Sequence, residues 1–139
     1  MQHFLLSSGQ WQGSGTISFS MSPDILHFRM LWQITQTSDS TWKALQTVEV
    51  LESHTMTNSF KIMAKESGRF DLLYENETVG TFTGSGICEK ETISWSYEHP
   101  GEFQGVERYQ RKGEFSYQFR SEYDGGDGFK TIIEGSLNQ

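Results

Sequence analysis

The sequence predicts an all-β protein that folds as one antiparallel, up-and-down β-barrel of about ten strands over residues 1–139. Three observations lead to this prediction. Apolar and polar residues alternate with a period of two along most of the chain, which is typical of strands with one buried side. Clusters of glycine, proline, serine and aspartate interrupt the alternation at short, regular intervals. The connections are short, so neighbours in sequence pair, and closure into a barrel removes exposed edge strands.

The first predicted strand, Gly9–Met21, shows the alternation most clearly. Trp11 and Phe19 share one face with Gly13 and Gly15, whereas glutamine, serine and threonine occupy the other face. Glycine on the apolar face of a strand allows a bend or the close approach of a second backbone. We therefore expect this strand to form part of the curved wall of a barrel.

The remaining strands are predicted over residues 25–36, 41–51, 55–65, 69–75, 78–88, 92–97, 103–112, 115–123 and 129–137. A turn at Ser22–Asp24 follows the first strand, another turn lies at His99–Gly101, and a glycine-rich loop at 124–128 precedes the last strand. The lead-in segment, residues 2–8, contains Phe4–Leu6, which form either a turn of helix or a plug at one barrel end.

Two predicted strands lack one clearly apolar face. Residues 78–88 are rich in glycine and threonine on both faces, and residues 103–112 carry charged side chains on both faces. The alternation alone therefore leaves the orientation of these two strands open.

Composition excludes several classes of function. The net charge is −7 and the isoelectric point is about 5.0, so the surface repels nucleic-acid phosphates and anionic lipid. No apolar run has the length of a membrane-spanning helix, which argues against membrane insertion. The single cysteine, Cys88, permits no internal disulfide, and the amino terminus lacks the features of a signal peptide. We therefore expect a cytoplasmic protein.

The tripeptide Gly9-Gln10-Trp11 resembles the Gly-x-Trp that opens the first strand of calycins. This group contains the lipocalins, the fatty-acid-binding proteins and lidless bacterial barrels. The resemblance implies a ligand cavity inside the barrel. Ser22–Asp24 leaves no room for the helical lid of fatty-acid-binding proteins. Nitrobindin-like barrels ligate haem through a histidine near the carboxyl end, whereas the last histidine here is His99. We therefore expect no cofactor. Phycobilin lyases share the architecture, but none of their residue patterns is found.

The strand over residues 103–112 contains the most informative candidates. Glu107, Tyr109 and Arg111 share one of its faces. If this face points inward, Arg111 and Tyr109 would bind a carboxylate or phosphate, because a guanidinium offers a fixed fork of donors to such anions. The arrangement resembles the arginine and tyrosine, two residues apart, that fatty-acid-binding proteins use. The alternative is a solvent-facing strand with ion pairs to its neighbours.

Aromatic residues on the predicted inner faces suggest the wall of a cavity. The residues expected to bind a ligand are Trp11, Phe28, Trp32, Phe60, Tyr109, Arg111, Tyr117 and Phe119. The alternative is that the aromatic side chains simply fill a core. Gln46 and Asn58 fall on inner faces as well, where they would either orient a ligand or hydrogen-bond within the core.

The leading hypothesis is a binding protein for a small apolar or amphipathic ligand, with or without an acidic head. An isomerase or hydrolase with Glu107 and Tyr109 as its acid/base pair is the second hypothesis, which a buried Glu107 would favour. A structural or partner-binding protein with a filled barrel is the third. The four histidines show no metal-ligand spacing, so we expect no metal site. The protein is expected to be a monomer or a homodimer.

Overall fold

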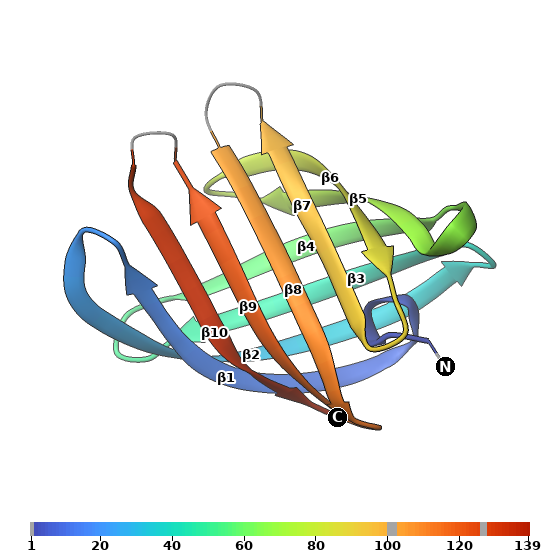
Figure 1. The fold of residues 1–139 in the computed structure, drawn as a ribbon, viewed down its shortest axis with the longest axis horizontal. Coiled ribbons are helices and arrows are strands. Elements are labelled where there is room, and N and C mark those ends of the chain that lie inside the picture. The colour runs from blue at the N-terminus through green and yellow to red at the C-terminus, as the bar shows by residue number, and fades with distance from the viewer. Residues whose placement is uncertain (1, 100–102, 126–127) are drawn as a thin grey trace.

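The computed structural model describes residues 2–99, 103–125 and 128–139, and it confirms the predicted closed barrel (Figure 1). The strands are β1 (Gly9–Phe19), β2 (Ser22–Ser38), β3 (Thr41–Val50), β4 (Thr55–Ala64), β5 (Arg69–Asn76), β6 (Gly80–Cys88), β7 (Thr92–His99), β8 (Phe103–Gly113), β9 (Ser116–Asp124) and β10 (Lys130–Asn138). Each strand pairs antiparallel with its neighbours in sequence, and β10 returns to β1. Two short 3-10 helices, η1 (Phe4–Leu6) and η2 (Glu66–Gly68), complete the described elements. None of the helices in the described part of the chain is long and apolar enough to cross a membrane.

The first predicted turn is wrong. The chain reverses at Ser20 and Met21, and Pro23 and Asp24 belong to β2. The register between β1 and β2 shifts at this point, from Ser18 opposite Ile25 to Phe19 opposite Ser22. Pro23 therefore lies in a bulge, where its missing N–H group leaves no ladder hydrogen bond unmade. The predicted features at Pro100–Gly101 and at residues 126–127 lie outside the described residues.

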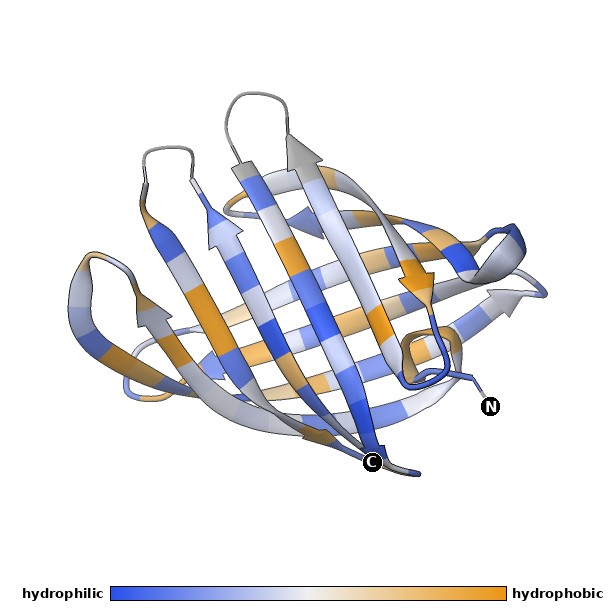
Figure 2. Ribbon diagram, in the orientation of Figure 1, coloured by the Kyte–Doolittle hydropathy of each residue, from blue (hydrophilic) through white to orange (hydrophobic). Residues whose placement is uncertain are grey.

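Alternation along the strands builds the interior of the barrel. In β2, Phe28, Met30, Trp32 and Ile34 are buried, whereas the residues between them face outward or lie at the surface. Figure 2 shows the same exchange of hydrophobic and hydrophilic residues along several strands. Because this burial removes large apolar surfaces from water, it supplies the main driving force for closing the wall on itself.

Strand β6 turns Gly84 and Gly86 inward. A Cβ atom added at Gly86 would lie 2.3 Å from Cζ of Phe70 and 2.5 Å from the carbonyl oxygen of Ser94. Neither atom leaves room for a side chain, so glycine lets β6 bend closely over the ring of Phe70. This explains why the 78–88 segment has no strongly apolar face although one of its faces is internal.

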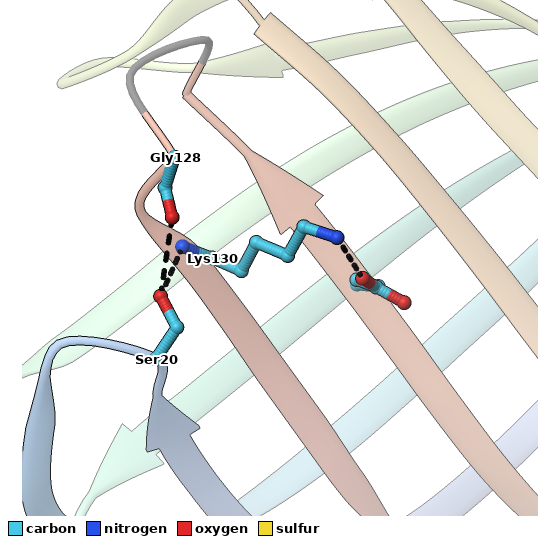
Figure 3. Close-up of polar contacts among 4 residues, drawn as sticks. Ser20, Gly128 and Lys130 are labelled. Carbon is cyan, nitrogen blue, oxygen red and sulfur yellow. Dashed lines mark hydrogen bonds and ion pairs between the residues drawn. The ribbon is translucent and has the colours of Figure 1, made fainter.

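The seam between β1 and β10 closes the barrel. Gly15 and Gly135 are directly opposite each other there, and a Cβ at Gly15 would lie 1.9 Å from the carbonyl oxygen of Glu134. Beyond the last paired residues, Ser20 continues the seam (Figure 3). Its hydroxyl donates to the carbonyl oxygen of Gly128 at 3.4 Å and accepts a hydrogen bond of 2.8 Å from the backbone N–H of Lys130.

The amino-terminal helix η1 plugs the opposite end of the barrel (Figure 1). Phe4, Leu5 and Leu6 are all buried, which confirms the predicted plug and the predicted turn of helix together. The Phe4 ring lies 4.9 Å from the Tyr109 ring and 5.2 Å from the Tyr117 ring, between centroids. The plug is therefore part of the aromatic core, so this end of the barrel is closed.

We predict that Phe4→Ala lowers the free energy of unfolding by about 3 kcal/mol, because it removes a buried ring and leaves a cavity among aromatic side chains. Phe115→Ala is the matched control, since Phe115 is 55% exposed. Denaturant unfolding of both variants measures the difference. Equal effects of the two substitutions would show that η1 does not seal the core.

Candidate functional site

The barrel interior is not completely filled. A cavity of about 450 Å³ lies on the open side of the plug, between the walls of the barrel. Its apolar lining includes Phe28, Val48, Phe60, Phe119 and Ile133. A hollow of this size and lining is typical of a small-molecule site.

Glu107 projects into this cavity from β8, and the residue is only 6% exposed. The strand register places it between Trp95 of β7 and Ser121 of β9. The Tyr97 hydroxyl donates a 2.9 Å hydrogen bond to Oε2, and the Ser121 hydroxyl donates a 2.9 Å hydrogen bond to Oε1. The Tyr123 side chain hydrogen-bonds the same carboxyl group. Strand β8 therefore turns its Glu107 face inward, and hydroxyl groups from both neighbouring strands surround the carboxyl.

Burial raises the pKa of Glu107 above the usual value for a glutamate, and the side-chain donors of Tyr97, Ser121, Tyr123 and Trp95 oppose this shift in part. The described residues that line the cavity include no lysine, arginine or histidine. The ionised carboxylate therefore has hydroxyl donors around it but no counter-charge on the cavity wall. Burial, followed by the nearby Glu107 charge, also raises the pKa of Tyr97, so its hydroxyl stays protonated and remains a donor.

A second polar group lies on the β3–β5 side of the cavity. Asn58 donates from Nδ2 to Oε1 of Gln46 at 2.8 Å, and its Oδ1 accepts hydrogen bonds from Tyr74 at 2.8 Å and from Asn76 at 2.6 Å. The Tyr74 ring lies 5.5 Å from the Tyr97 ring, between centroids. The two polar groups of the cavity therefore meet at this pair of tyrosines.

Backbone donors determine which way these amides point. Oδ1 of Asn76 accepts from the backbone N–H groups of Thr78 and Val79, so its Nδ2 must be the group that donates to Asn58. Asn58 then donates to Gln46, and among the described residues Nε2 of Gln46 donates to the thioether sulfur of Met30 alone, at 3.5 Å. A thioether is a weak acceptor. Gln46 therefore keeps a strong donor available to a ligand.

Half of the predicted ligand-binding residues face the cavity. Phe28, Phe60, Tyr109 and Phe119 line it. Trp11, Trp32 and Tyr117 pack against Phe4 at the plugged end instead. For these three aromatic residues, the structure matches the alternative in which the rings fill a core.

Arg111 also lies at the plugged end. Its guanidinium donates to the backbone oxygen of Gln2 at 3.1 Å and to Nδ1 of His3 at 3.2 Å, and it lies over the Tyr117 ring. Tyr109 lines the cavity, whereas Arg111, two residues further along β8, is not among the residues that line it. The predicted anion clamp of Arg111 and Tyr109 is therefore not assembled on the cavity wall.

His3 connects Arg111 to the plug. Arginine only donates hydrogen bonds, so Nδ1 of His3 is an acceptor and Nε2 carries the proton that it shares with the backbone oxygen of Glu89. Burial lowers the pKa of His3, and the charge of Arg111 lowers it further. The neutral imidazole is therefore the form that holds the plug in place.

Sequence reasoning missed Tyr97, Ser121 and Tyr123 as partners of Glu107. The signal was present in part, because Tyr97 and Tyr123 fall on inner faces of their strands in the alternation. What the alternation lacks is the register between strands, which brings Ser121 opposite Glu107.

Other surface and reactive features are poorer candidates for a site. A wider groove of about 1260 Å³ crosses the outside of β5–β7, but it is open to solvent. Among the described residues, no three His, Cys, Asp or Glu side chains are grouped as metal ligands. Burial raises the pKa of Cys88 to about 11, which keeps this thiol protonated and unreactive.

Comparison with known proteins shows the fold alone. No family model and no curated protein matches the chain. The S-type phycobiliprotein lyase CPES from Guillardia theta is 11% identical with a TM-score of 0.73, over 96% of this chain and 88% of that chain. Rv2717c from M. tuberculosis is 11% identical with a TM-score of 0.75, over 95% and 91% of the two chains. EF1p2_mFAP2b bound to DFHBI is 14% identical with a TM-score of 0.51, over 97% and 94%. These neighbours are consistent with a calycin-like barrel.

Ionisation of Glu107 should lower the stability of the wild-type protein as pH rises. We predict that Glu107→Gln reduces this loss of stability. The pKa of Glu107 is higher in the folded protein than in the unfolded chain, so its stabilising contribution is complete at acidic pH and disappears as pH rises through the folded pKa. Denaturant unfolding between pH 5 and pH 8 measures this slope. Glu122→Gln, which changes an outward carboxylate, should keep the wild-type slope. A Glu107→Gln slope equal to that of wild type would contradict the assignment.

We predict the opposite pH dependence for His3, whose protonation lowers the stability of the folded protein as pH falls. Its pKa lies below the ordinary histidine value of 6.5, so below that pH the unfolded chain takes up a proton that the folded protein resists. Stability is therefore complete above pH 6.5 and falls as the solution becomes more acidic. His3→Gln should reduce this fall in unfolding experiments between pH 7.5 and pH 5, whereas His27→Gln, at an exposed residue, should not. An unchanged slope in His3→Gln would refute the role of the neutral imidazole.

Proposed function

We propose that this protein binds a small, largely apolar ligand in the barrel cavity, as a lidless member of the calycin group. The observation that supports the proposal most is the cavity of about 450 Å³, with aromatic and aliphatic walls and a few ordered polar groups. Two structural neighbours agree with such a role, since one is a phycobiliprotein lyase and another is bound to the small molecule DFHBI. We propose that the protein acts in the cytoplasm and that it is a monomer or a homodimer.

An acidic head group fits this cavity poorly. Arg111, the cation of the predicted anion clamp, is engaged at the plugged end, and the carboxyl group of Glu107 faces the cavity. A ligand carboxylate beside Glu107 would force one of the two groups to take up a proton. Gln46 instead offers a neutral donor, suited to a carbonyl or hydroxyl oxygen of the ligand.

A second candidate function is a small-molecule isomerase or hydrolase. The specific observation in its favour is Glu107, a buried carboxyl group of raised pKa on the wall of a cavity. Its hydroxyl partner is Tyr97 rather than the Tyr109 of the sequence prediction. In this alternative, Glu107→Gln would abolish turnover of a bound substrate while leaving its binding intact.

The binding function can be tested with Prodan, a neutral dye whose emission changes in apolar surroundings. Val48 lines the cavity, so Val48→Phe fills part of it and should weaken Prodan binding by about tenfold or more, through steric exclusion. Val106→Phe adds the same atoms on the outer surface, where Val106 is 52% exposed, and should leave the affinity unchanged.

Native mass spectrometry of the purified protein gives an independent measurement. Extra mass that disappears on denaturation would identify a carried ligand.

Failure of Prodan to bind the wild-type protein, or equal binding to both phenylalanine variants, would overturn the proposed cavity function.

A further inference from the structure

We propose that Glu107 selects the ligand, and that the ligand carries a protonated amine or a similar N–H-bearing cation on an apolar body. This inference rests on the proposed binding function and names the chemical class that the cavity would take.

The donors around Glu107 are neutral. Tyr97 and Ser121 each donate one hydrogen bond of 2.9 Å, and Tyr123 contributes a further one. Trp95 also contributes at this carboxyl group, but its indole N–H donates a 2.7 Å hydrogen bond to the Tyr97 hydroxyl. Because a carboxylate has about four acceptor positions, the three hydroxyl groups leave acceptor capacity for a ligand. The carboxyl group also lines the cavity, so this capacity faces the space that a ligand would occupy.

The described part of the cavity wall has no positive charge to pair with Glu107. A buried carboxylate is normally paired with a cation, because hydroxyl donors alone offset only part of the loss of hydration. The cations in the described part of β8 do not supply it. Arg111 is committed to Gln2 and His3, and Arg108 and Lys112 are exposed on the opposite face of the strand. A cationic ligand would bring the charge that the cavity wall lacks.

The arrangement is also prepared for such a ligand. Glu107 is held from both neighbouring strands, and Trp95 in turn donates to the Tyr97 hydroxyl at 2.7 Å. The carboxyl group is therefore ordered and already removed from water in the free protein. Binding would therefore remove water from the ligand cation, while the carboxyl group already lies in position and out of water.

The geometry also excludes the opposite class. An anionic head would meet Glu107 with no compensating cation among the described residues of the cavity wall. A neutral head would gain a hydrogen bond without the added attraction between charges. The expected order of affinity is therefore amine, then alcohol, then carboxylic acid, for ligands with the same apolar body.

Competition against bound Prodan at pH 7 tests this order. Octylamine and octanol share one octyl chain and differ only in the head group, and octanoic acid has the same number of carbon atoms, one of them in its carboxyl group. We expect octylamine to displace Prodan at a concentration about tenfold lower than octanol requires, with octanoic acid the weakest of the three. Prodan itself has no N–H group, so its binding does not depend on the proposed contact.

Variants separate Glu107 from the general negative charge of the protein, which is −7. In Glu107→Gln, the advantage of octylamine over octanol should fall to less than about twofold, because the charge-assisted hydrogen bond is lost. Glu122→Gln removes the same charge from an outward residue that pairs with Lys130, and should retain the advantage. If Glu107→Gln does not fold, the absence of an octylamine preference in the wild-type protein would still overturn the amine proposal.

Each outcome is informative. Binding of Prodan without any preference for octylamine would overturn the amine proposal and leave the cavity function standing. A preference that persists in Glu107→Gln would overturn the role of Glu107. If neither Prodan nor any of the three competitors binds, the proposed function and this inference both fail.

Discussion

Closure of the sheet is the constraint on which the rest of the structure depends. Strand β10 must return to β1, and the two backbones approach too closely at this seam for side chains at Gly15 and Gly135. An ordinary residue there would push the strands apart and leave two exposed sheet edges. The glycines of β1 therefore allow one continuous wall to surround an interior. Gly86 has a similar role on the other side of the barrel, where β6 bends over Phe70.

Within that wall, the two ends of the barrel have different roles. The plugged end is filled by Phe4–Leu6 and by aromatic rings, and its buried polar atoms are held by His3 and Arg111. The open end keeps a cavity, with a carboxyl group on its wall that costs stability when it ionises. An apolar residue in place of Glu107 would avoid this cost in stability. The burial of Glu107 beside an unfilled space is better explained by a binding or catalytic role than by folding.

Much of the wall could be predicted from alternation, because a repeat of two residues specifies which side chains share a face of a strand. The strand bounds agree with the prediction to within a few residues, apart from the bulge at Pro23 and Asp24. Prediction was weaker inside the barrel. Phe28 and Trp32 carry the same alternation signal, yet Phe28 lines the cavity and Trp32 packs against the plug. The two residues differ in their position along the barrel axis. The alternation within one strand does not show how far the plug extends into the barrel.

The sequence by itself determined the class of fold, since alternation, turn residues and the inward glycines of the first strand are local properties of the chain. It also contained the plug, as a short apolar run ahead of the first strand. Only the tertiary structure decided which polar groups act together. Glu107, Tyr97 and Ser121 come from three strands and meet because of register, and Arg111 is drawn away from Tyr109 by contacts with Gln2 and His3, more than a hundred residues earlier in the chain. Pairing between strands is a non-local choice, in which the free energy of the whole closed barrel selects one register, so no single segment could have revealed the site.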